Sequence, residues 1–262
     1  MKSISIGLRA FVVGIAAVLL LASGAGAAEV RVMISGGLTA AYKALVPDFE
    51  RTTGHKVITA YGPSMGTTVN AIPVRLERGE PADVLIMVGY ALGDLAKQGK
   101  VIAGSSVDLV KSPIGMAVKS GAPKPDISSV DALKRTLLAA KSIVYSDPAK
   151  GGASGVYFAH VVEQLGIADQ LKSRTILVPG AQAGDVVAKG EAEIGVGQAS
   201  EIVPVAGAQL VGPLPGEFAS VTAFSAAIGA GTKSAEAAKS LILFLTGPSA
   251  APVLKSKGFQ PG

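Results

Sequence analysis

Cysteine and tryptophan are absent from this 262-residue chain, and histidine occurs only twice. Without cysteine there is no disulfide framework, no thiolate metal site and no residue for a lipoprotein anchor, so the fold has to be stabilised by burial alone. The absence of tryptophan argues against a site that stacks sugar rings. Charge is sparse as well, since only 16% of the residues are Asp, Glu, Lys or Arg.

The amino-terminal segment predicts a cleavable secretory signal peptide, residues 1–27. Lys2 and Arg9 precede an uninterrupted apolar run from Ala10 to Ala22, and Ala25-Gly-Ala27 has the small residues of a signal peptidase site. The run is too short to span a bilayer. Removing this segment lowers the net charge from +5 to +3. We therefore expect an exported, soluble protein of the bacterial periplasm, whose charge is too low for nucleic acid but suits an anionic ligand.

Glycine and hydroxyl residues gather in loops that follow predicted strands and precede predicted helices. The clearest case is the stretch from Tyr145 to Gly166, where a buried strand ends, a loop of small residues follows, and apolar residues then recur at helical spacing. A helix start leaves backbone N–H groups unpaired at the positive end of the helix dipole, so such a loop can seat an anion. The alternative is that Ser154 only caps the helix. The other loops of this kind are 35–37 and 62–68.

Strands alternate with helices along the whole mature chain, which predicts an α/β doubly wound architecture with parallel sheets. Two extended passes, 112–119 and 220–228, flank the middle third of the sequence. We therefore predict a discontinuous lobe 1 (28–115 and 220–262) and a lobe 2 (116–219), joined by a hinge. Ligands bind outside the carboxyl ends of the strands in such sheets, so two facing sheets should form one central cleft.

Five stretches, in this order and spacing, resemble the periplasmic solute-binding proteins of the molybdate-binding type. The resemblance covers nearly the whole mature chain and implies the two-lobed type II periplasmic solute-binding fold with a small anionic ligand. The stretches are Ile34–Thr39, Arg78–Val84, Asp147-Pro148 with Ala153–Tyr157, Gly190–Gly195, and Leu245–Ser249.

The resemblance also implies where an oxyanion would be held: by two serines, one after each of the first two strands, by backbone N–H groups of the central loops, and by a tyrosine. Ser64 matches the second serine, and Ala153 and Ser154 match the loop that supplies N–H groups. Gly37 stands in place of the first serine, and Gln198 stands in place of the tyrosine. Two of the three side-chain ligands are thus missing, and molybdate is not the ligand we expect.

Within the same superfamily the chain resembles the periplasmic aconitate isomerases, which interconvert trans-aconitate and cis-aconitate. That resemblance implies an allylic proton shift on a tricarboxylate, with no metal or organic cofactor required. The alternative is a non-catalytic receptor that delivers a molybdate-like oxyanion or a small carboxylate to the membrane subunits of an ABC transporter. In either case we expect a monomer that binds a small anion and no nucleic acid.

The candidate ligand-binding residues share a position in loops after strands, where ordinary helix capping is their alternative role. Lys150 is the nearest cation and could neutralise ligand charge, or could simply be solvated. The candidates are Ser35, Gly36, Gly37, Ser64, Gly66, Thr67, Ala153, Ser154 and Gln198, with Gly155 as a helper.

Candidates for proton transfer are His160 and Tyr157, which lie one turn apart on the same predicted helix. A surface position is the alternative for His160. Glu201 and Asp185, beside the cleft loops, could serve as a base if desolvation raised their pKa values, although a tricarboxylate would repel them. Tyr61 and Tyr90 are expected at strand ends facing the cleft. His55, Arg75, Glu77 and Arg78 are expected on the surface.

Overall fold

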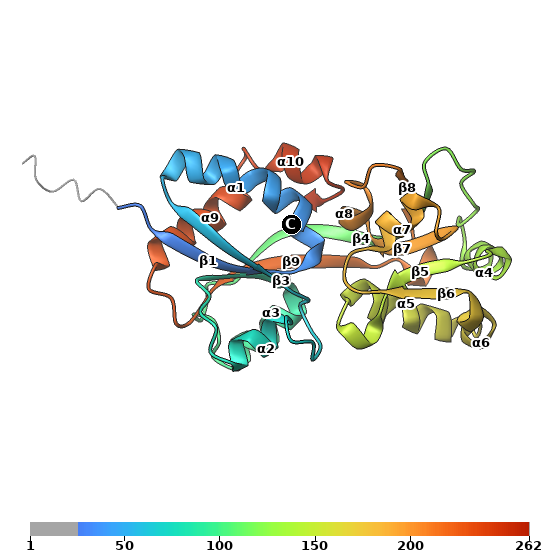
Figure 1. Ribbon diagram of the computed structural model, residues 1–262, viewed down its shortest axis with the longest axis horizontal. Coiled ribbons are helices and arrows are strands. Elements are labelled where there is room, and N and C mark those ends of the chain that lie inside the picture. Colours follow the sequence, from blue (N-terminus) through green and yellow to red (C-terminus); the bar gives the residue numbers. More distant parts are fainter. Residues whose placement is uncertain (1–25, 262) are drawn as a thin grey trace, which may run out of the picture.

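In the computed structural model, which describes residues 26–261, the chain forms two lobes arranged along the long axis of the molecule (Figure 1). The predicted signal peptide, residues 1–27, falls almost wholly outside the described residues. Across the part that is described, no helix combines the length and the apolarity that a membrane crossing requires.

Lobe 1 is built around β3 (Val84–Val88), whose five residues are all buried. Val84, Ile86 and Val88 pack into one group of apolar side chains, whereas Leu85 and Met87 pack into another, because successive side chains of a strand point to opposite faces. Helices therefore cover both faces of this sheet, as the continuous apolar run predicted. One face carries α1 (Thr39–Thr53), α9 (Ala235–Thr246) and α10 (Ala251–Ser256), and the other carries α2 (Ile72–Glu77) and α3 (Gly89–Lys97) (Figure 1).

The strands of lobe 1 follow the order β2-β1-β3-β9-β4. The first three are parallel, and β9 runs antiparallel to both of its neighbours. The remaining bounds are β1 (Glu29–Ile34), β2 (Lys56–Tyr61), β4 (Val107–Lys119), β9 (Val221–Ile228) and the short β10 (Gln260–Pro261), which pairs with β4.

Lobe 2 has its own sheet and its own apolar core. Its parallel strands lie in the order β7-β5-β6, and β4 and β8 complete the sheet in antiparallel fashion. Its strands are β5 (Ile143–Ser146), β6 (Thr175–Val178), β7 (Ile194–Gln198) and β8 (Ala208–Pro213). Its helices are α4 (Val130–Ala139), α5 (Ala153–Gln164), α6 (Ala168–Leu171), α7 (Ala183–Lys189) and α8 (Ala199–Ile202).

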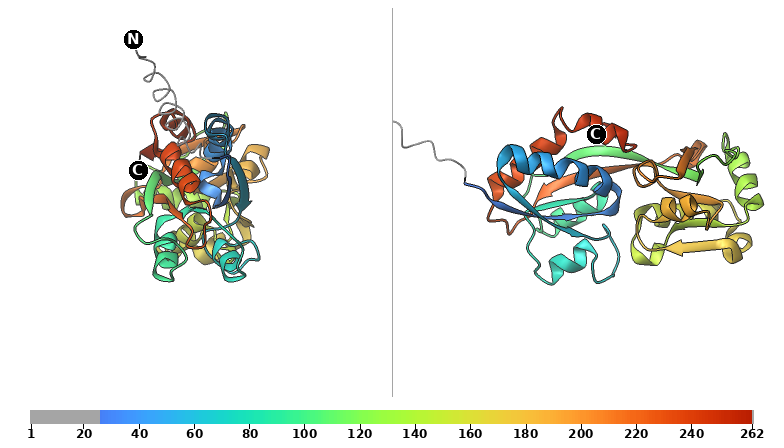
Figure 2. Two further views of the ribbon diagram at one scale, coloured as in Figure 1. Left: turned by 90° about the vertical axis from the view of Figure 1, so that its left-hand side faces the viewer. Right: turned by 45° about the horizontal axis from the view of Figure 1, so that its top comes forward.

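Strand β4 belongs to both lobes. Ser112 and Pro113 pair with β9, and the next residues, Ile114 to Ala117, pair with β7 (Figure 2). The two-lobed α/β fold is therefore confirmed, but its sheets are mixed rather than wholly parallel. The difference arises because the two extended passes run in opposite directions between the lobes and pair with each other.

His55 corrects one expectation about the surface. It is only 7% exposed, and its Nδ1 accepts a hydrogen bond from the Ala28 backbone N–H at 3.2 Å. The ring also packs against Phe49, with the ring centroids 5.9 Å apart. His55 is thus a buried residue that ties the start of the described chain to the end of α1, far from the loops between the lobes.

Candidate functional site

A cavity of about 330 Å³ lies between the lobes. Both lobes contribute polar groups to it, and these come from the loops that follow strands, as the sequence predicted. Lobe 1 contributes the loop after β1 and the loop after β2 to the cavity wall. From lobe 2 come the loop after β5, the segment 179–182 after β6, and the end of β7 with the start of α8.

The loop after β1 brings an unpaired hydroxyl to the cavity. The Ser35 N–H donates to the Ile86 carbonyl at 2.9 Å, which fixes the backbone, but Ser35 Oγ has no hydrogen-bond partner among residues 26–261 although the residue is only 4% exposed. Ser35 stands at the N-cap of the 3-10 turn η1 (Gly36–Leu38) without a side-chain cap bond. A buried hydroxyl left unsatisfied is costly, so this one is suited to a bound acceptor.

Gly37 is glycine for a steric reason. A Cβ atom at this position would lie 2.2 Å from Cζ of Phe224, whose ring also lines the cavity. No larger residue fits while the ring stays there. The space that the side chain of the first serine would need is therefore occupied by the Phe224 ring.

The loop after β2 contributes Ser64, Thr68 and Asn70 to the cavity wall. Ser64 Oγ accepts a hydrogen bond from the Val88 N–H at 3.1 Å, so its own proton remains available to a ligand. Thr68 Oγ1 is a second buried hydroxyl with no partner in the described chain.

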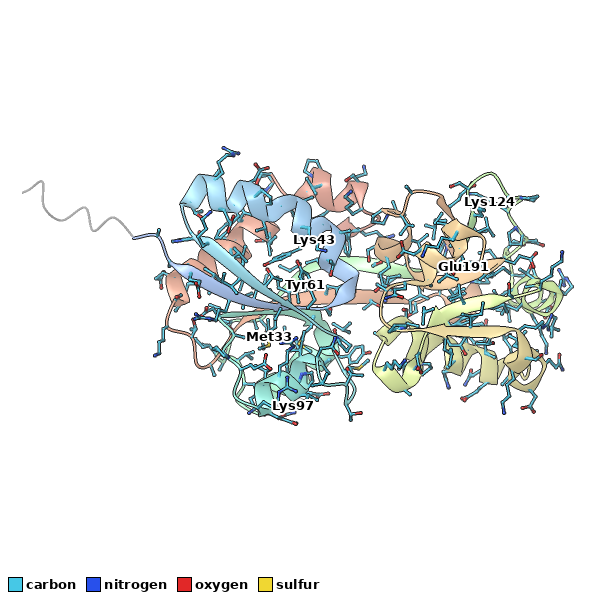
Figure 3. All side chains as sticks on the ribbon, in the orientation of Figure 1. Met33, Lys43, Tyr61, Lys97, Lys124 and Glu191 are labelled. Carbon is cyan, nitrogen blue, oxygen red and sulfur yellow. The ribbon has the colours of Figure 1, made fainter. Side chains whose placement is uncertain are left out.

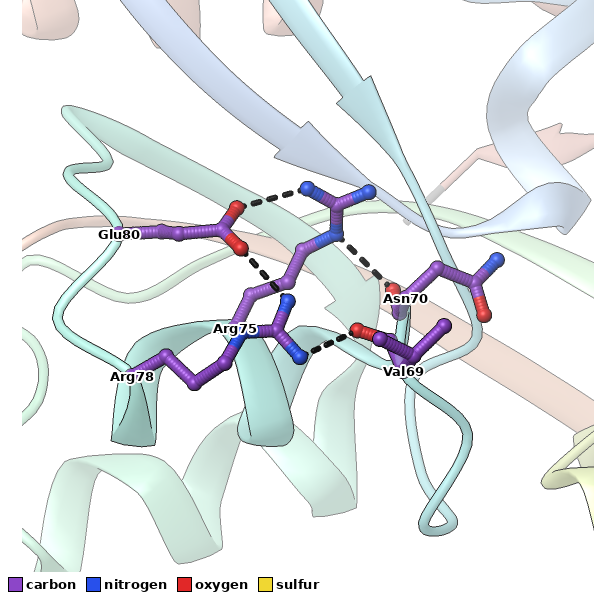
Figure 4. Close-up of polar contacts among 5 residues, drawn as sticks. All are labelled: Val69, Asn70, Arg75, Arg78 and Glu80. Atoms are coloured by element: carbon purple, nitrogen blue, oxygen red, sulfur yellow. Dashed lines mark hydrogen bonds and ion pairs between the residues drawn. The ribbon is translucent and has the colours of Figure 1, made fainter.

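A charged cluster next to this loop holds it in place (Figure 4). Arg75 Nε donates to the Asn70 carbonyl at 3.1 Å, and Arg78 donates to the Val69 carbonyl at 2.7 Å. Glu80 accepts from both arginines, at 2.7 and 2.6 Å, and these bonds lower the pKa of its carboxyl. The two arginines are thus braces for the loop and not only an exposed charged face.

On lobe 2, the start of α5 is not capped by a side chain. Its N-cap is Gly152, and Ser154 Oγ lies 3.2 Å from Ser146 Oγ instead of capping the helix. A Cβ atom on Gly155 would lie 1.8 Å from the Ser146 carbonyl oxygen, so glycine is needed where the helix meets the strand end. The capping role considered for Ser154 is therefore wrong, and the helix start, at the positive end of the dipole, lies at the cavity.

The end of β7 and the helix α8 that follows it each carry one polar side chain of the cavity wall. Gln198 is 2% exposed, and its Nε2 donates to Thr222 Oγ1 at 2.7 Å. Glu201 Oε2 accepts from the Gln198 N–H at 3.4 Å, a long bond. Glu201 is half-buried in the cleft, and this burial raises the pKa of its carboxyl to about 7, against a smaller lowering by the Gln198 N–H.

The lobes touch at two places beside the cavity. A Cβ atom on Gly151 of lobe 2 would lie 2.0 Å from the Met65 carbonyl oxygen of lobe 1, and a Cβ atom on Gly36 would lie 3.3 Å from Cβ of Ala181. Glycines at these contacts let the backbones approach each other closely. The cleft is thus closed in this structure.

Tyr61 and Lys150 are the remaining ionisable residues of the wall. Lys43 Nζ lies 5.1 Å from the centroid of the Tyr61 ring, and both side chains are labelled in Figure 3. Partial burial raises the pKa of the Tyr61 phenol, which keeps it a neutral hydrogen-bond donor. Lys150 Nζ lies 3.7 Å from Asp147 Oδ2.

Most of the expected ligand-binding residues meet at the cavity. Gly66 and Thr67 are not on its wall, although Gly66 lies at the contact with Gly151. The wall includes Ser35, Gly36, Gly37, Ser64, Ala153, Ser154 and Gln198. Whether they bind a ligand stays a prediction.

The two expected catalytic residues do not line the cavity. The Tyr157 hydroxyl donates to the Phe218 carbonyl at 3.1 Å, and His160 is exposed. The turn of α5 that carries them lies beyond the cavity, since only its first residues, Ala153 and Ser154, reach the wall.

Among the alternatives for proton transfer, Tyr61 and Glu201 are on the wall. Tyr90, 60% exposed, and Asp185 are not. Sequence reasoning missed Thr68, Asn70, Ser146 and Gln182, which line the cavity. Ser146 directly follows a predicted strand that ends at Tyr145, and this position after a strand could have identified it. Within residues 26–261, side chains able to ligate a metal do not gather in groups of three or more.

Comparison with known proteins places the fold and the site in context. Residues 30–260 match the family model of the bacterial extracellular solute-binding proteins. The chain is 41% identical to an aconitate isomerase of a Pseudomonas species over 231 residues, which cover 88% of this chain and 87% of the relative. It is 32% identical to the molybdate-binding protein ModA of Azotobacter vinelandii over 249 residues, covering 92% and 93%.

The fold is also found among solved structures. The periplasmic molybdate-binding protein of Azotobacter vinelandii superposes with a TM-score of 0.71 at 21% sequence identity, covering 89% of this chain and 99% of that one. Such a likeness concerns the architecture of the two lobes.

Proposed function

This chain belongs to the family of bacterial extracellular solute-binding proteins, and from that premise we propose that it is a periplasmic aconitate isomerase, which interconverts trans-aconitate and cis-aconitate. The observation that carries the proposal is the closed cavity, whose hydroxyls and helix starts come from several loops on two lobes. The 41% identity to an aconitate isomerase over most of both chains supports the same reaction.

A tricarboxylate suits the distribution of donors in this cavity. Ser35 and Ser64 lie on lobe 1, whereas the start of α5 lies on lobe 2, so one carboxylate can be held on each side. Phe224 over Gly37 adds an apolar surface, which fits the carbon skeleton of an organic acid better than a tetrahedral oxyanion. The glutamine at position 198 removes the tyrosine that the molybdate pattern requires.

The chemistry is an allylic proton shift. A C–H bond beside a carboxyl group breaks, its electron pair moves into the three-carbon unit, and a proton is added at the other end, so that the double bond changes place. The conformation in which the protein binds the single bond that becomes the double bond decides whether the product is cis or trans. The protein has to hold the carboxylates, supply a proton carrier and exclude water, and a closed cleft favours all three.

A second candidate is a non-catalytic receptor for an ABC transporter. The specific observation in its favour is the 32% identity to a molybdate-binding protein over almost the full length of both chains. A receptor needs the same cleft to close on a ligand without reacting with it, and fold alone does not separate the two.

The test is a direct assay of turnover. The purified mature chain, residues 28–262, is incubated with trans-aconitate, and conversion to cis-aconitate is followed by proton NMR. Conversion above the buffer rate is expected, and its absence removes the isomerase. A thermal-shift screen in parallel distinguishes the receptor, which should be stabilised by molybdate, tungstate or sulfate and not by either aconitate.

The proposal also covers the domain organisation, the cellular location and the oligomeric state of the protein. We propose that lobe 1 (28–115 and 220–262) and lobe 2 (116–219) move as units about the β4 and β9 crossing, that the signal directs the chain to the periplasm, and that the protein is a monomer. Size-exclusion chromatography with light scattering tests the last point.

A further inference from the structure

Glu201 occupies an unusual place in the cavity. It follows β7 on the short helix α8, and its carboxyl group lies between a loop of lobe 1 and a strand of lobe 2. Oε1 is 3.6 Å from the position of a Cβ atom on Gly36, and Oε2 is 3.5 Å from that of a Cβ atom on Gly197. The carboxyl group is thus flanked from both lobes by residues without side chains.

Glu201 has a local structural role as the third helical residue of a capping box at the start of α8, but that role does not require a charged side chain. Enclosed carboxylates are normally paired with a cation or with several hydrogen-bond donors. Glu201 forms no ion pair within the described chain, and its one hydrogen bond there is the 3.4 Å contact from the Gln198 N–H. A glutamine could accept that bond equally well without the cost of burying a charge.

Other ionisable groups near the cavity are less suited to carry a proton between carbon atoms. Tyr61 remains protonated because its phenol pKa is raised, and Lys150 is partly exposed beside Asp147. The half-buried Lys257, whose neighbour Gly258 packs against Ala199 of α8, is off the cavity wall. On the helices and strands packed against α8, all the ionisable side chains are exposed and off the wall as well. These are Asp185 and Lys189 of α7, and Asp108, Lys111 and Lys119 of β4.

The pKa of the Glu201 carboxyl is suited to proton transfer near neutral pH. Burial raises its pKa to about 7, so both its acid and its base forms are populated near neutral pH. A general acid–base group is most effective when its pKa lies near the working pH. A carboxylate that accepts the proton becomes a carboxylic acid, and this acid can then donate a proton back to the substrate.

We propose that Glu201 is the acid–base residue of the isomerisation. Its carboxylate accepts the proton from the allylic carbon of the bound tricarboxylate, and the C–H electron pair enters the delocalised three-carbon unit. The resulting carboxylic acid then returns a proton to the opposite end of that unit, which restores the carboxylate. This inference rests on the proposed function and names the residue that performs it.

Three proteins test the assignment: the unmodified chain, Glu201→Gln, and the control Asp185→Asn, which also removes one carboxylate but from the exposed face of α7. In Glu201→Gln, kcat should fall by about a hundredfold or more. The dissociation constant for cis-aconitate, from calorimetry, should stay the same or decrease, because one negative charge has left the cavity. Asp185→Asn should match the unmodified chain in both measurements.

Running the reaction in D₂O separates failure of this inference from failure of the proposed function. NMR then reports conversion and, independently, the replacement of allylic hydrogen by deuterium. If the unmodified chain does not convert trans-aconitate, the proposed function fails, and the exchange still decides the role of Glu201.

Exchange catalysed by the unmodified chain and lost in Glu201→Gln supports the assignment. Exchange or turnover in Glu201→Gln within threefold of the unmodified chain overturns it, as does the absence of both turnover and exchange from the unmodified chain. Circular dichroism of all three proteins verifies that they are folded.

Discussion

The two walls of the cavity differ in kind. Lobe 1 presents the neutral hydroxyls of Ser35, Ser64 and Thr68. Ser35 lies on the loop after β1, and the other two lie on the loop after β2, which Arg75 and Arg78 brace. Lobe 2 presents a helix start together with Lys150 and Glu201. The difference suggests a division of labour, in which lobe 1 mainly holds the ligand and lobe 2 adds the groups whose charge changes. Four predictions test this division.

The largest effect should come from the charge that lobe 2 buries. Folding raises the pKa of the Glu201 carboxyl from 4.5 to about 7. Between these pH values the folded protein keeps a proton on Glu201 that the unfolded chain has released. The contribution of this carboxyl to stability is therefore lost as pH rises from 4.5 through 7. Relative to the unmodified chain, Glu201→Gln should therefore gain about 3 kcal/mol between pH 4 and pH 8. Urea unfolding at both pH values measures it. An equal difference at the two values would show that the carboxyl is not desolvated.

Gly151 tests whether the two walls must meet. In Gly151→Ala the new Cβ atom would lie 2.0 Å from the Met65 carbonyl oxygen, which opposes closure. Strain of about 1–3 kcal/mol should weaken aconitate binding by roughly 5- to 150-fold in calorimetry. Gly121→Ala is the matched control, because Gly121 has φ of 83° against 80° for Gly151 and open space around its Cβ position. If both variants bind equally well, the contact between the lobes does not limit binding.

The neutral wall should respond in affinity. Loss of the Ser35 hydroxyl in Ser35→Ala removes a hydrogen bond to a carboxylate, worth about 1.5 kcal/mol or roughly tenfold in the dissociation constant. The ligand-free protein should be as stable or more stable, since Ser35 Oγ is a buried hydroxyl without a partner within residues 26–261. Ser64→Ala should lose affinity and also about 1 kcal/mol of stability, because the Val88 N–H loses its acceptor. A drop in kcat at unchanged affinity in Ser35→Ala would contradict the division of labour.

The smallest effect is expected from the brace behind lobe 1. Arg78→Ala removes the hydrogen bonds that Arg78 donates to the Val69 carbonyl and to Glu80. The loop that carries Thr68 then becomes less ordered, and aconitate binding should weaken about threefold. Arg51→Ala, which removes an exposed pair with Asp48, should leave binding unchanged in the same titration. Equal affinities for both variants would mean that the brace does not position the loop.

Much of the fold could be predicted from local patterns. The continuous apolar run of β3 predicts a strand that is buried on both faces. The glycine after α1 predicts the end of that helix, because glycine favours a left-handed C-cap. Strand β8 and helix α8 were missed. Strand β8 is half-buried up to its exposed last residue, Pro213, and α8 has only four residues, so neither shows a regular apolar period.

The site was harder to predict because it depends on contacts between distant segments. Ser35 and Ser64 were expected at the cavity because both follow strands, and strand ends gather at one edge of a sheet. Spacing along α5, in contrast, could not show that Tyr157 turns toward Phe218. Nor could it reveal that Phe224, far along the chain, fills the space beside Gly37. These positions depend on how β9 crosses the lobes.

The pairing of β3 with β9 also constrains the order in which the protein folds. Val84 lies opposite Ile228, so the sheet of lobe 1 gains its fourth strand only after the whole of lobe 2 has been synthesised. Lobe 2 is a continuous stretch and is free to collapse first, whereas the early strands must wait for a late partner. The sheet of lobe 1 is therefore complete only once nearly the whole chain has been made, an order of assembly that is compatible with the export proposed above.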